Sequence, residues 1–134
     1  MNDDWPRDPN PFSAACPSRI IFDHIADKWT MLTLCTLAMK PIRFNELKRE
    51  VEGISQKMLS QTLKKLERDG LITRQAFPTV PVTVEYAITP LGQTLSCVAA
   101  NIAAWTTNHI AEVLAAQERY DRQNLDGPAF QGIK

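Results

Sequence analysis

Cysteine is scarce in this sequence, which carries only Cys16, Cys35 and Cys97. An odd number of cysteines at wide spacing, with no CxxC pair, is not the pattern of a disulfide framework or of a structural zinc site. The glycine-rich loops that cradle phosphates, GxxxxGK(S/T) and GxGxxG, are missing as well. We therefore expect neither a bound metal nor a cofactor.

Long hydrophobic runs are also absent, since no apolar stretch approaches the roughly 18 residues of a membrane span. The chain starts Met1-Asn2-Asp3-Asp4, without the basic and apolar segments of a signal peptide. Its 134 residues, 44% of them hydrophobic, suit one soluble domain with some additional helix. These features predict a cytoplasmic protein that has no membrane partner.

A net charge is lacking too, because 15 basic and 15 acidic residues cancel. That balance by itself argues against a nucleic-acid binder. The charge is unevenly distributed, however: residues 40–76 hold nine basic and five acidic side chains, whereas both flanking segments are acidic. A basic middle region can place a local positive patch against phosphates.

Both ends of the chain lack hydrophobic periodicity. Residues 1–15 are rich in proline and acidic residues, and residues 121–134 include Gly127-Pro128. Such compositions are typical of flexible segments. We therefore expect a mobile N-terminal arm over 1–15, a folded domain over 16–120 and a mobile C-terminal tail over 121–134.

The first part of the folded region is predicted to be helical. Ser18 can cap a helix that presents Ile21 and Ile25 on one face. Asp27 can cap a following helical segment, which ends before Lys40-Pro41 because proline cannot continue a helix. The pattern alone does not distinguish one bent helix from two.

A helix-turn-helix is predicted next. A short helix with Phe44 and Leu47 on its apolar face ends at Gly53, and Ser55 caps the following helix, predicted over 55–69. The apolar stripe of this second helix consists of Leu59, Leu63 and Leu66. A helix, a tight glycine turn and a capped helix at this spacing form the helix-turn-helix unit.

Two strands follow this unit. Residues 71–77 form the first strand, and residues 82–89 alternate between apolar and polar side chains with a period of two. The segment 78–81, which contains two prolines, joins them. A β-hairpin directly after a helix-turn-helix is a wing, so the predicted fold is mainly α with a small β-hairpin, a winged helix-turn-helix.

A long helix is predicted over 90–120, since Thr89 can cap it and Pro90 suits its first position. Apolar residues recur along it at steps of three and four, as in a coiled-coil seam: Leu91, Leu95, Val98, Ile102 and Trp105. A small core cannot cover so long a stripe, so we expect a second copy of the protein to cover it in a homodimer. The alternative is that residues 106–108 break the helix and let it fold back.

Opposite the leucines of helix 55–69 lies a face of amide, hydroxyl and basic side chains. Glutamine can pair with adenine, and lysine can reach guanine or phosphate. The expected contacts to double-stranded DNA, on this helix and beside it, are Arg43, Ser55, Gln56, Lys57, Ser60, Gln61, Lys64, Lys65, Arg68 and Arg74. The wing tip carries no basic residue, which weakens the case for a minor-groove contact there.

In these segments the sequence resembles the HxlR-type family, a branch of the winged-helix regulators related to MarR-type proteins. The similarity covers about residues 16–118, and its carriers include Asp27-Lys28-Trp29-Thr30, Gly53-Ile54-Ser55-Gln56-Lys57-Met58-Leu59, Leu66-Glu67-Arg68-Asp69-Gly70-Leu71-Ile72 and Thr89-Pro90-Leu91-Gly92. The resemblance implies a homodimeric bacterial transcription factor on an inverted-repeat operator. It also implies that the first helix, with Ile21, and the long last helix build the dimer.

Cys16 matches the position at which some members of this family sense oxidants or electrophiles. It precedes a helix N-terminus, where the helix dipole favours a thiolate, and a flexible arm would leave it accessible. Oxidation could then join it to another thiol, such as the partner's Cys97. The alternative is that Cys16 only packs at the dimer interface. We expect Cys35 in the core and Cys97 at the interface.

The sequence leaves one rival control mechanism open and disfavours two other functions. A small-molecule effector in the dimer cleft, near Phe22, Trp29 or Trp105, is the rival to control through Cys16. A thiol enzyme is disfavoured because Cys16 has no recognisable His/Asp partner, so we expect no enzyme activity. A winged helix that contacts only proteins should carry more apolar residues on helix 55–69. His24 and His109 are expected to be structural.

Overall fold

The computed structural model describes residues 10–125. These residues fall into two compact units, one that ends at Ala99 and one that starts at Ala100. Of the arm expected over 1–15, residues 1–9 lie outside the described part, and of the tail expected over 121–134, residues 126–134 do. Within 10–125 no helix combines the length and apolar character needed to cross a membrane.

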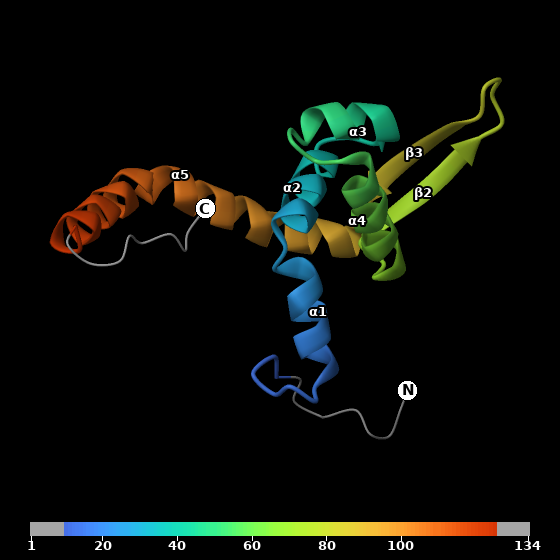
Figure 1. The fold of residues 1–134 in the computed structure, drawn as a ribbon. Helices are drawn as coiled ribbons and strands as arrows, with labels where there is room; N and C mark the ends of the chain where they lie inside the picture. Colours follow the sequence, from blue (N-terminus) through green and yellow to red (C-terminus); the bar gives the residue numbers. More distant parts are fainter. Residues whose placement is uncertain (1–9, 126–134) are drawn as a thin grey trace. The chain divides into compact units, whose positions relative to one another are not determined.

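The chain is mainly helical with one small antiparallel sheet (Figure 1). In order, the elements are α1 (Pro17–Ile25), α2 (Lys28–Leu37), β1 (Ile42–Arg43), α3 (Phe44–Glu50), α4 (Gln56–Arg68), β2 (Ile72–Phe77), β3 (Thr83–Ile88) and α5 (Pro90–Gln123). The sheet order is β1-β3-β2. This confirms the predicted winged helix-turn-helix, with β1 as an additional short strand that the sequence pattern did not reveal.

The first two helices are separate, because Asp27 between them has an extended backbone. Its side chain accepts a hydrogen bond from the Thr30 amide, so the predicted cap of α2 is confirmed. The cap predicted for α1 is wrong: the N-cap residue is Cys16, and Ser18 lies inside the helix. Pro17 takes the first helical position, where its missing N–H costs nothing, so the helix begins before Ser18 rather than after it.

The core lies between α2, α3, α4 and the sheet. Leu47, Leu59, Leu63 and Leu66 come from the predicted apolar faces. The full set of large, fully buried apolar side chains is Leu34, Leu37, Ile42, Leu47, Leu59, Leu63, Leu66 and Ile72. Two glycines in the left-handed region, Gly53 with φ of 91° and Gly70 with φ of 76°, let the chain turn before and after α4. These turns fix which face of α4 is turned to the core and which to solvent.

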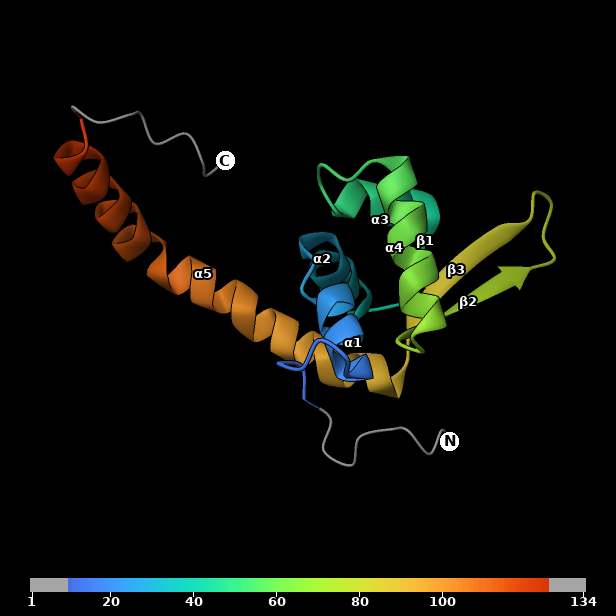
Figure 2. The same ribbon diagram turned by 60° about the horizontal axis from the view of Figure 1, so that its bottom comes forward.

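The wing consists of β2 and β3, paired from Ile72 opposite Ile88 to Phe77 opposite Thr83. In both ribbon views the hairpin projects from the helices (Figures 1 and 2). At its base Ile72 is buried, whereas residues 73–76 are exposed. The wing is therefore anchored at one end only.

The last helix, α5, starts as the capping pattern predicted. The Thr89 hydroxyl accepts from the Gly92 amide at 3.0 Å and donates to the Gly70 carbonyl at 2.7 Å. The helix continues without a break through residues 106–108, so the alternative of a fold-back there is wrong. It ends at Gln123, somewhat beyond the expected Tyr120.

Candidate nucleic-acid interface

The second helix of the helix-turn-helix, α4, separates an apolar face from a polar one. Ser55 caps it by accepting from the Met58 amide at 3.0 Å. Leu59, Thr62, Leu63 and Leu66 are buried against the core. On the opposite side the exposed residues are Gln56, Lys57, Gln61, Lys64 and Arg68, with Ser60 partly buried beside them.

This exposed face has the chemistry of a surface that contacts a polyanion. Its N-terminal half offers lysine and glutamine and no carboxylate, and the first acidic residue of α4 is Glu67. The positive end of the helix dipole lies at the same end. Amide and ammonium groups that are free of competing carboxylates can bond to base edges and phosphates.

Two residues of the predicted DNA-contacting set have other roles in the structure. The Ser55 hydroxyl is used as the helix cap. Lys65 is partly buried, and its Nζ donates to the His24 carbonyl at 3.0 Å and lies 3.8 Å from an Asp27 carboxylate oxygen. Because Lys65 turns toward the α1–α2 junction, the structure separates it from the exposed face of α4.

The two predicted DNA contacts outside α4, Arg43 and Arg74, lie on the sheet. Arg43 in β1 is paired in register with Glu85 of β3 and is exposed. Arg74 in β2 lines a hollow of about 380 Å³ together with Ser60, Lys64, Glu67 and Tyr86. Sequence reasoning did not single out Tyr86, whose place in the alternating pattern of β3 marked it only as a strand residue.

Cys16 is bonded at the start of α1. Its Sγ accepts from the Asn10 amide at 3.3 Å and lies 3.1 Å from the Ser18 hydroxyl. The side-chain hydrogen bond with Ser18, followed by backbone hydrogen bonds from Asn10 and Ser18, lowers the pKa of the thiol below its ordinary value. The geometry therefore stabilises a thiolate at this position.

The expected accessibility of Cys16 is wrong, because only 5% of the residue is exposed. Residues 10–15 fold over it in turns, and the Arg19 guanidinium donates to the backbone carbonyls of Pro11 and Phe12. The segment expected to be a flexible arm is thus tied to α1 from Asn10 onward.

The other two cysteines differ from Cys16. Cys35, expected in the core, is only partly buried, because the fully buried positions of α2 are Thr30, Thr33, Leu34 and Leu37. Its partial burial still raises the pKa of its thiol. Cys97 is exposed on α5.

The predicted dimer residues are largely exposed in the single chain. In the first unit Ile21 is 44% exposed, Leu91 57% and Val98 53%, and in the second unit Ile102 is 45% and Trp105 55% exposed. Leu95 differs, since it packs against the core. Exposed apolar residues that the prediction omitted include Ile20 and Phe22 on α1 and Ile110 and Leu114 on α5. The last two are four residues apart, one helical turn, and this spacing was a usable signal.

The aromatic residues considered for an effector site have local partners. Trp29 packs against the core and carries the Lys28 ammonium 4.5 Å from its ring centre. Trp105 stacks on His109 with ring centres 4.6 Å apart. Among residues 10–125, no three His, Cys, Asp or Glu side chains gather in a way that could hold a metal ion.

Comparison with known proteins matches the family model of the HxlR-like helix-turn-helix over residues 24–113. YtfH of Escherichia coli, an HTH-type transcriptional regulator, is 42% identical over 109 residues, which cover 81% of this chain and 86% of that protein. The solved structure of YtfH from Salmonella typhimurium, a transcriptional regulator, is 40% identical with a TM-score of 0.78, and the match covers 83% of this chain and 99% of that one.

A further solved structure, the redox regulator HypR in its oxidised form, is 33% identical with a TM-score of 0.64. The match covers 69% of this chain and 96% of HypR. The fold, the order of its elements and these matches agree with one another. The chain is therefore a transcriptional regulator of the HxlR-like helix-turn-helix family.

Proposed function

We propose that the protein acts as a homodimer on an inverted-repeat operator in double-stranded DNA, with α4 reading the bases. The observation that carries this proposal is the exposed face of α4, where Lys57, Gln61 and Lys64 all precede Glu67, the first carboxylate of the helix. A face meant only for solvent would normally intermix acidic residues. A regulator of this kind works where the chromosome lies, in the cytoplasm of a bacterial cell.

Phosphate contacts would come from cations beside α4. Arg74 opens onto the hollow that Ser60 and Lys64 also line, next to the reading face. Arg43 is exposed on the short strand that leads into α3. Such contacts fix register and orientation on the duplex, whereas α4 supplies the sequence preference.

The homodimer follows from apolar surface that the single chain leaves in water. Exposed apolar side chains occur at helical spacing along α5 and on α1, including Ile21, Val98 and Trp105. Full burial of an exposed apolar side chain is worth about 1.5–3 kcal/mol, and these side chains have roughly half of that still to gain. A dimer with two-fold symmetry fits an inverted-repeat operator, because each recognition helix then reads one half-site.

The test is operator binding by the purified protein, measured by gel shift on a palindromic fragment from the region upstream of its own gene. A lost bidentate base contact costs about five- to 150-fold in affinity, so Gln61→Ala and Lys57→Ala should each fall in that range while the dimer persists. Gln117→Ala, exposed on α5, is the matched control. Normal binding by both α4 variants would refute the assigned reading face.

We further propose that oxidation of Cys16 controls this binding, as the similarity to the redox regulator HypR suggests. The hydrogen bonds at its Sγ favour the thiolate, which is the reactive form. With diamide as oxidant, Cys16 and a second thiol, such as the partner's Cys97, lose two protons and two electrons to the N=N bond. A disulfide forms, and the diamide becomes a hydrazine.

Diamide should therefore lower the operator affinity of the wild-type protein, and dithiothreitol should restore it. Cys16→Ser should not respond, and Cys35→Ser is the control that should respond like the wild type. If Cys16→Ser and wild type respond equally to diamide, the switch at Cys16 is refuted. If neither responds, an effector other than an oxidant becomes the controlling signal.

A further inference from the structure

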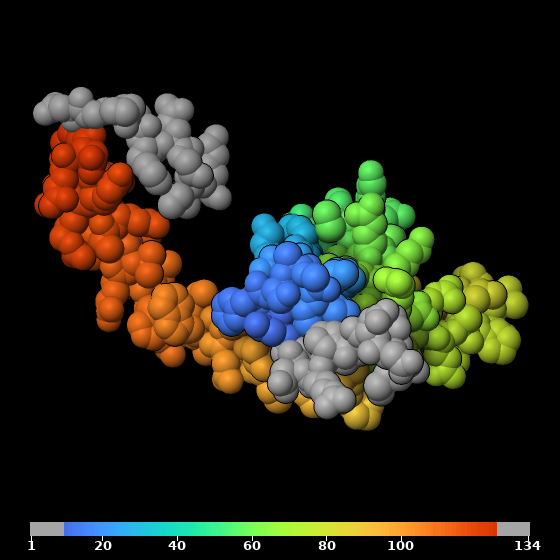
Figure 3. All heavy atoms as spheres, turned by 90° about the horizontal axis from the view of Figure 1, so that it is seen from below, coloured from blue at the N-terminus to red at the C-terminus, as the bar shows by residue number. Residues whose placement is uncertain are grey.

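The first helix is held to the rest of its unit by few apolar contacts. None of the residues of α1 is buried, and Ile20, Ile21 and Phe22 are each more than two-fifths exposed. Figure 3 shows α1, in blue, at the surface of the unit on this side. The position of α1 therefore depends strongly on whatever polar contacts it makes.

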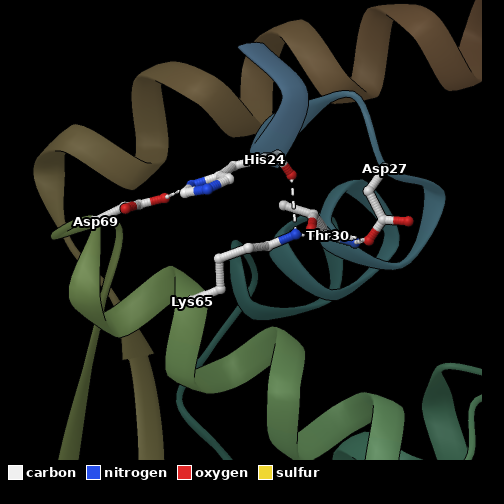
Figure 4. A network of polar contacts seen from close by, with 5 residues as sticks. All are labelled: His24, Asp27, Thr30, Lys65 and Asp69. Atoms are coloured by element: carbon white, nitrogen blue, oxygen red, sulfur yellow. Dashed lines mark hydrogen bonds and ion pairs between the residues drawn. The ribbon is translucent and has the colours of Figure 1, made fainter. Parts of the chain in front are cut away.

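Those contacts lead to the C-terminal end of α4 (Figure 4). His24, in the last turn of α1, places Nδ1 2.9 Å from a carboxylate oxygen of Asp69. Lys65, one turn before Asp69, donates from Nζ to the His24 carbonyl at 3.0 Å. The same Nζ lies 3.8 Å from Asp27, whose carboxylate caps α2 through the Thr30 amide and hydroxyl. Together these residues form a latch between the α1–α2 junction and α4.

Asp69 stands at a position that its own helix does not favour. It is the C-cap of α4, at the negative end of the helix dipole, and only 12% of its side chain is exposed. A carboxylate that is mostly buried needs a donor, and His24 is the donor that the structure provides. The pair therefore ties the end of α4 to α1.

Lys65 satisfies a complementary need on α1. The last carbonyls of a helix have no partner within it, and the His24 carbonyl is one of them. An ammonium group there completes the hydrogen bonding and complements the dipole of α1. Both ends of the latch thus involve helix termini, where a small rotation breaks the contact.

We propose that Lys65 and Asp69 are positioning residues, which hold α4 at the angle that DNA binding requires and transmit movements of α1 to it. This inference rests on the proposed reading of DNA by α4. Cys16 lies at the N-cap of the same helix whose last turn holds His24. A change at Cys16 that shifts α1 therefore pulls on the reading helix through these side chains.

The salt dependence of operator affinity separates this role from a direct DNA contact. The plot of log K against log salt has a negative slope, and each lost phosphate contact makes that slope less steep by about 0.9. We expect Lys65→Met to weaken binding by about five- to tenfold with an unchanged slope, whereas Lys64→Met should reduce the slope. Lys65→Arg, which keeps a donor, should retain affinity.

Matched variants complete the set. His24→Asn keeps a donor toward Asp69 and should bind normally, whereas Asp69→Ala should weaken binding as Lys65→Met does. Lys40→Met breaks an exposed ion pair with Glu46, at 3.3 Å, that does not involve α4, and should have no effect. A reduced slope for Lys65→Met, or unchanged affinity in both Lys65→Met and Asp69→Ala, would overturn the proposal.

Hydrogen exchange of the free, full-length protein tests the latch without DNA. Lys65→Met should speed amide exchange in α1 and in the last turn of α4 and leave exchange in the wing strand β2 unchanged. Unchanged exchange in α1 would overturn the latch. Absence of operator binding by the wild type would instead refute the proposed function, and the exchange result would still decide whether α1 is held to α4.

Discussion

Thr33 carries a hydroxyl with no hydrogen-bond partner among the described residues, although the residue is fully buried in α2. A buried polar group without a hydrogen-bond partner destabilises the fold by about 1–3 kcal/mol, because it loses its hydrogen bonds to water. An apolar group of the same shape has no such desolvation penalty. Thr33→Val should therefore raise the free energy of unfolding by about 1 kcal/mol. Urea denaturation under reducing conditions measures it.

Thr36 is the control for Thr33 on the same helix. Its hydroxyl donates to the Leu32 carbonyl at 2.8 Å, so Thr36→Val removes a made hydrogen bond and should not stabilise. Equal gains in both variants would mean that valine simply suits this helix, and the account of Thr33 would be wrong.

Cys16 is more buried than Cys35, yet its thiol should ionise at lower pH. The reason is that hydrogen bonding outweighs desolvation at Cys16. The pKa of Cys16 is lowered by Ser18 and Asn10, and that of Cys35 is raised by partial burial. A lowered folded-state pKa contributes stability above the unfolded pKa and loses it as the pH falls through the folded pKa. Cys16 should therefore stabilise the fold most in mildly alkaline solution.

Thiolate absorbance near 240 nm measures this order. In a protein that carries Cys35→Ser and Cys97→Ser, the remaining thiol should titrate below the ordinary cysteine pKa. In one that carries Cys16→Ser and Cys97→Ser, it should titrate above that value. The reverse order would contradict the hydrogen-bonding account of Cys16.

At the scale of elements, α5 approaches the core through small residues. Gly92, Ser96 and Ala99 are its buried positions, four and three residues apart, and Leu95 packs beside them. The sequence pattern placed Leu95 in the exposed seam, because a stripe of large residues is easier to recognise than a stripe of small ones. Two backbones can approach closely only where the side chains between them are small, and a pattern of hydrophobic residues does not reveal where small side chains are needed.

Gly92→Ala tests this close approach. A Cβ there would lie 2.1 Å from the Leu71 carbonyl oxygen, which is backbone and cannot rotate away. Alanine usually stabilises a helix by up to about 1 kcal/mol over glycine, but here we expect a loss of about 1–3 kcal/mol or more in thermal unfolding. Asn101→Ala, at an exposed position of α5, should be neutral or stabilising. A Gly92→Ala protein as stable as the wild type would contradict the packing.

At the scale of the whole molecule, the proposed homodimer predicts how charged variants on α5 behave. Trp105 is 55% exposed and contacts His109 of its own helix. If this face is the dimer interface, Trp105→Lys should place a charge there and yield monomers in light scattering at micromolar concentration. Operator affinity should fall with the dimer.

Ala104→Lys adds the same charge at an exposed position on the other side of α5 and should remain dimeric. Dimers for both variants would exclude the Trp105 face from the interface. Monomers for both would show that the effect is one of charge on the helix rather than of position.

The sequence by itself determined the order of the helices, the wing and the apolar face of α4. Caps at Asp27, Ser55 and Thr89, and the leucine spacing of α4, act over a few residues, so they can be recognised locally. The short strand β1 was missed because its two residues form a strand only by pairing with β3, far along the chain. Its identity depends on a partner, not on a pattern.

Only the tertiary structure decided what individual polar side chains do. Lys65 looks like a DNA contact in sequence, yet it bonds to a carbonyl 41 residues away, and His24 meets Asp69 across 45 residues. Cys16 looks accessible in sequence, yet residues 10–15 cover it. Short-range preferences fix each helix and its faces, but partners for charges arise only when helices pack, because that packing sets which polar groups meet.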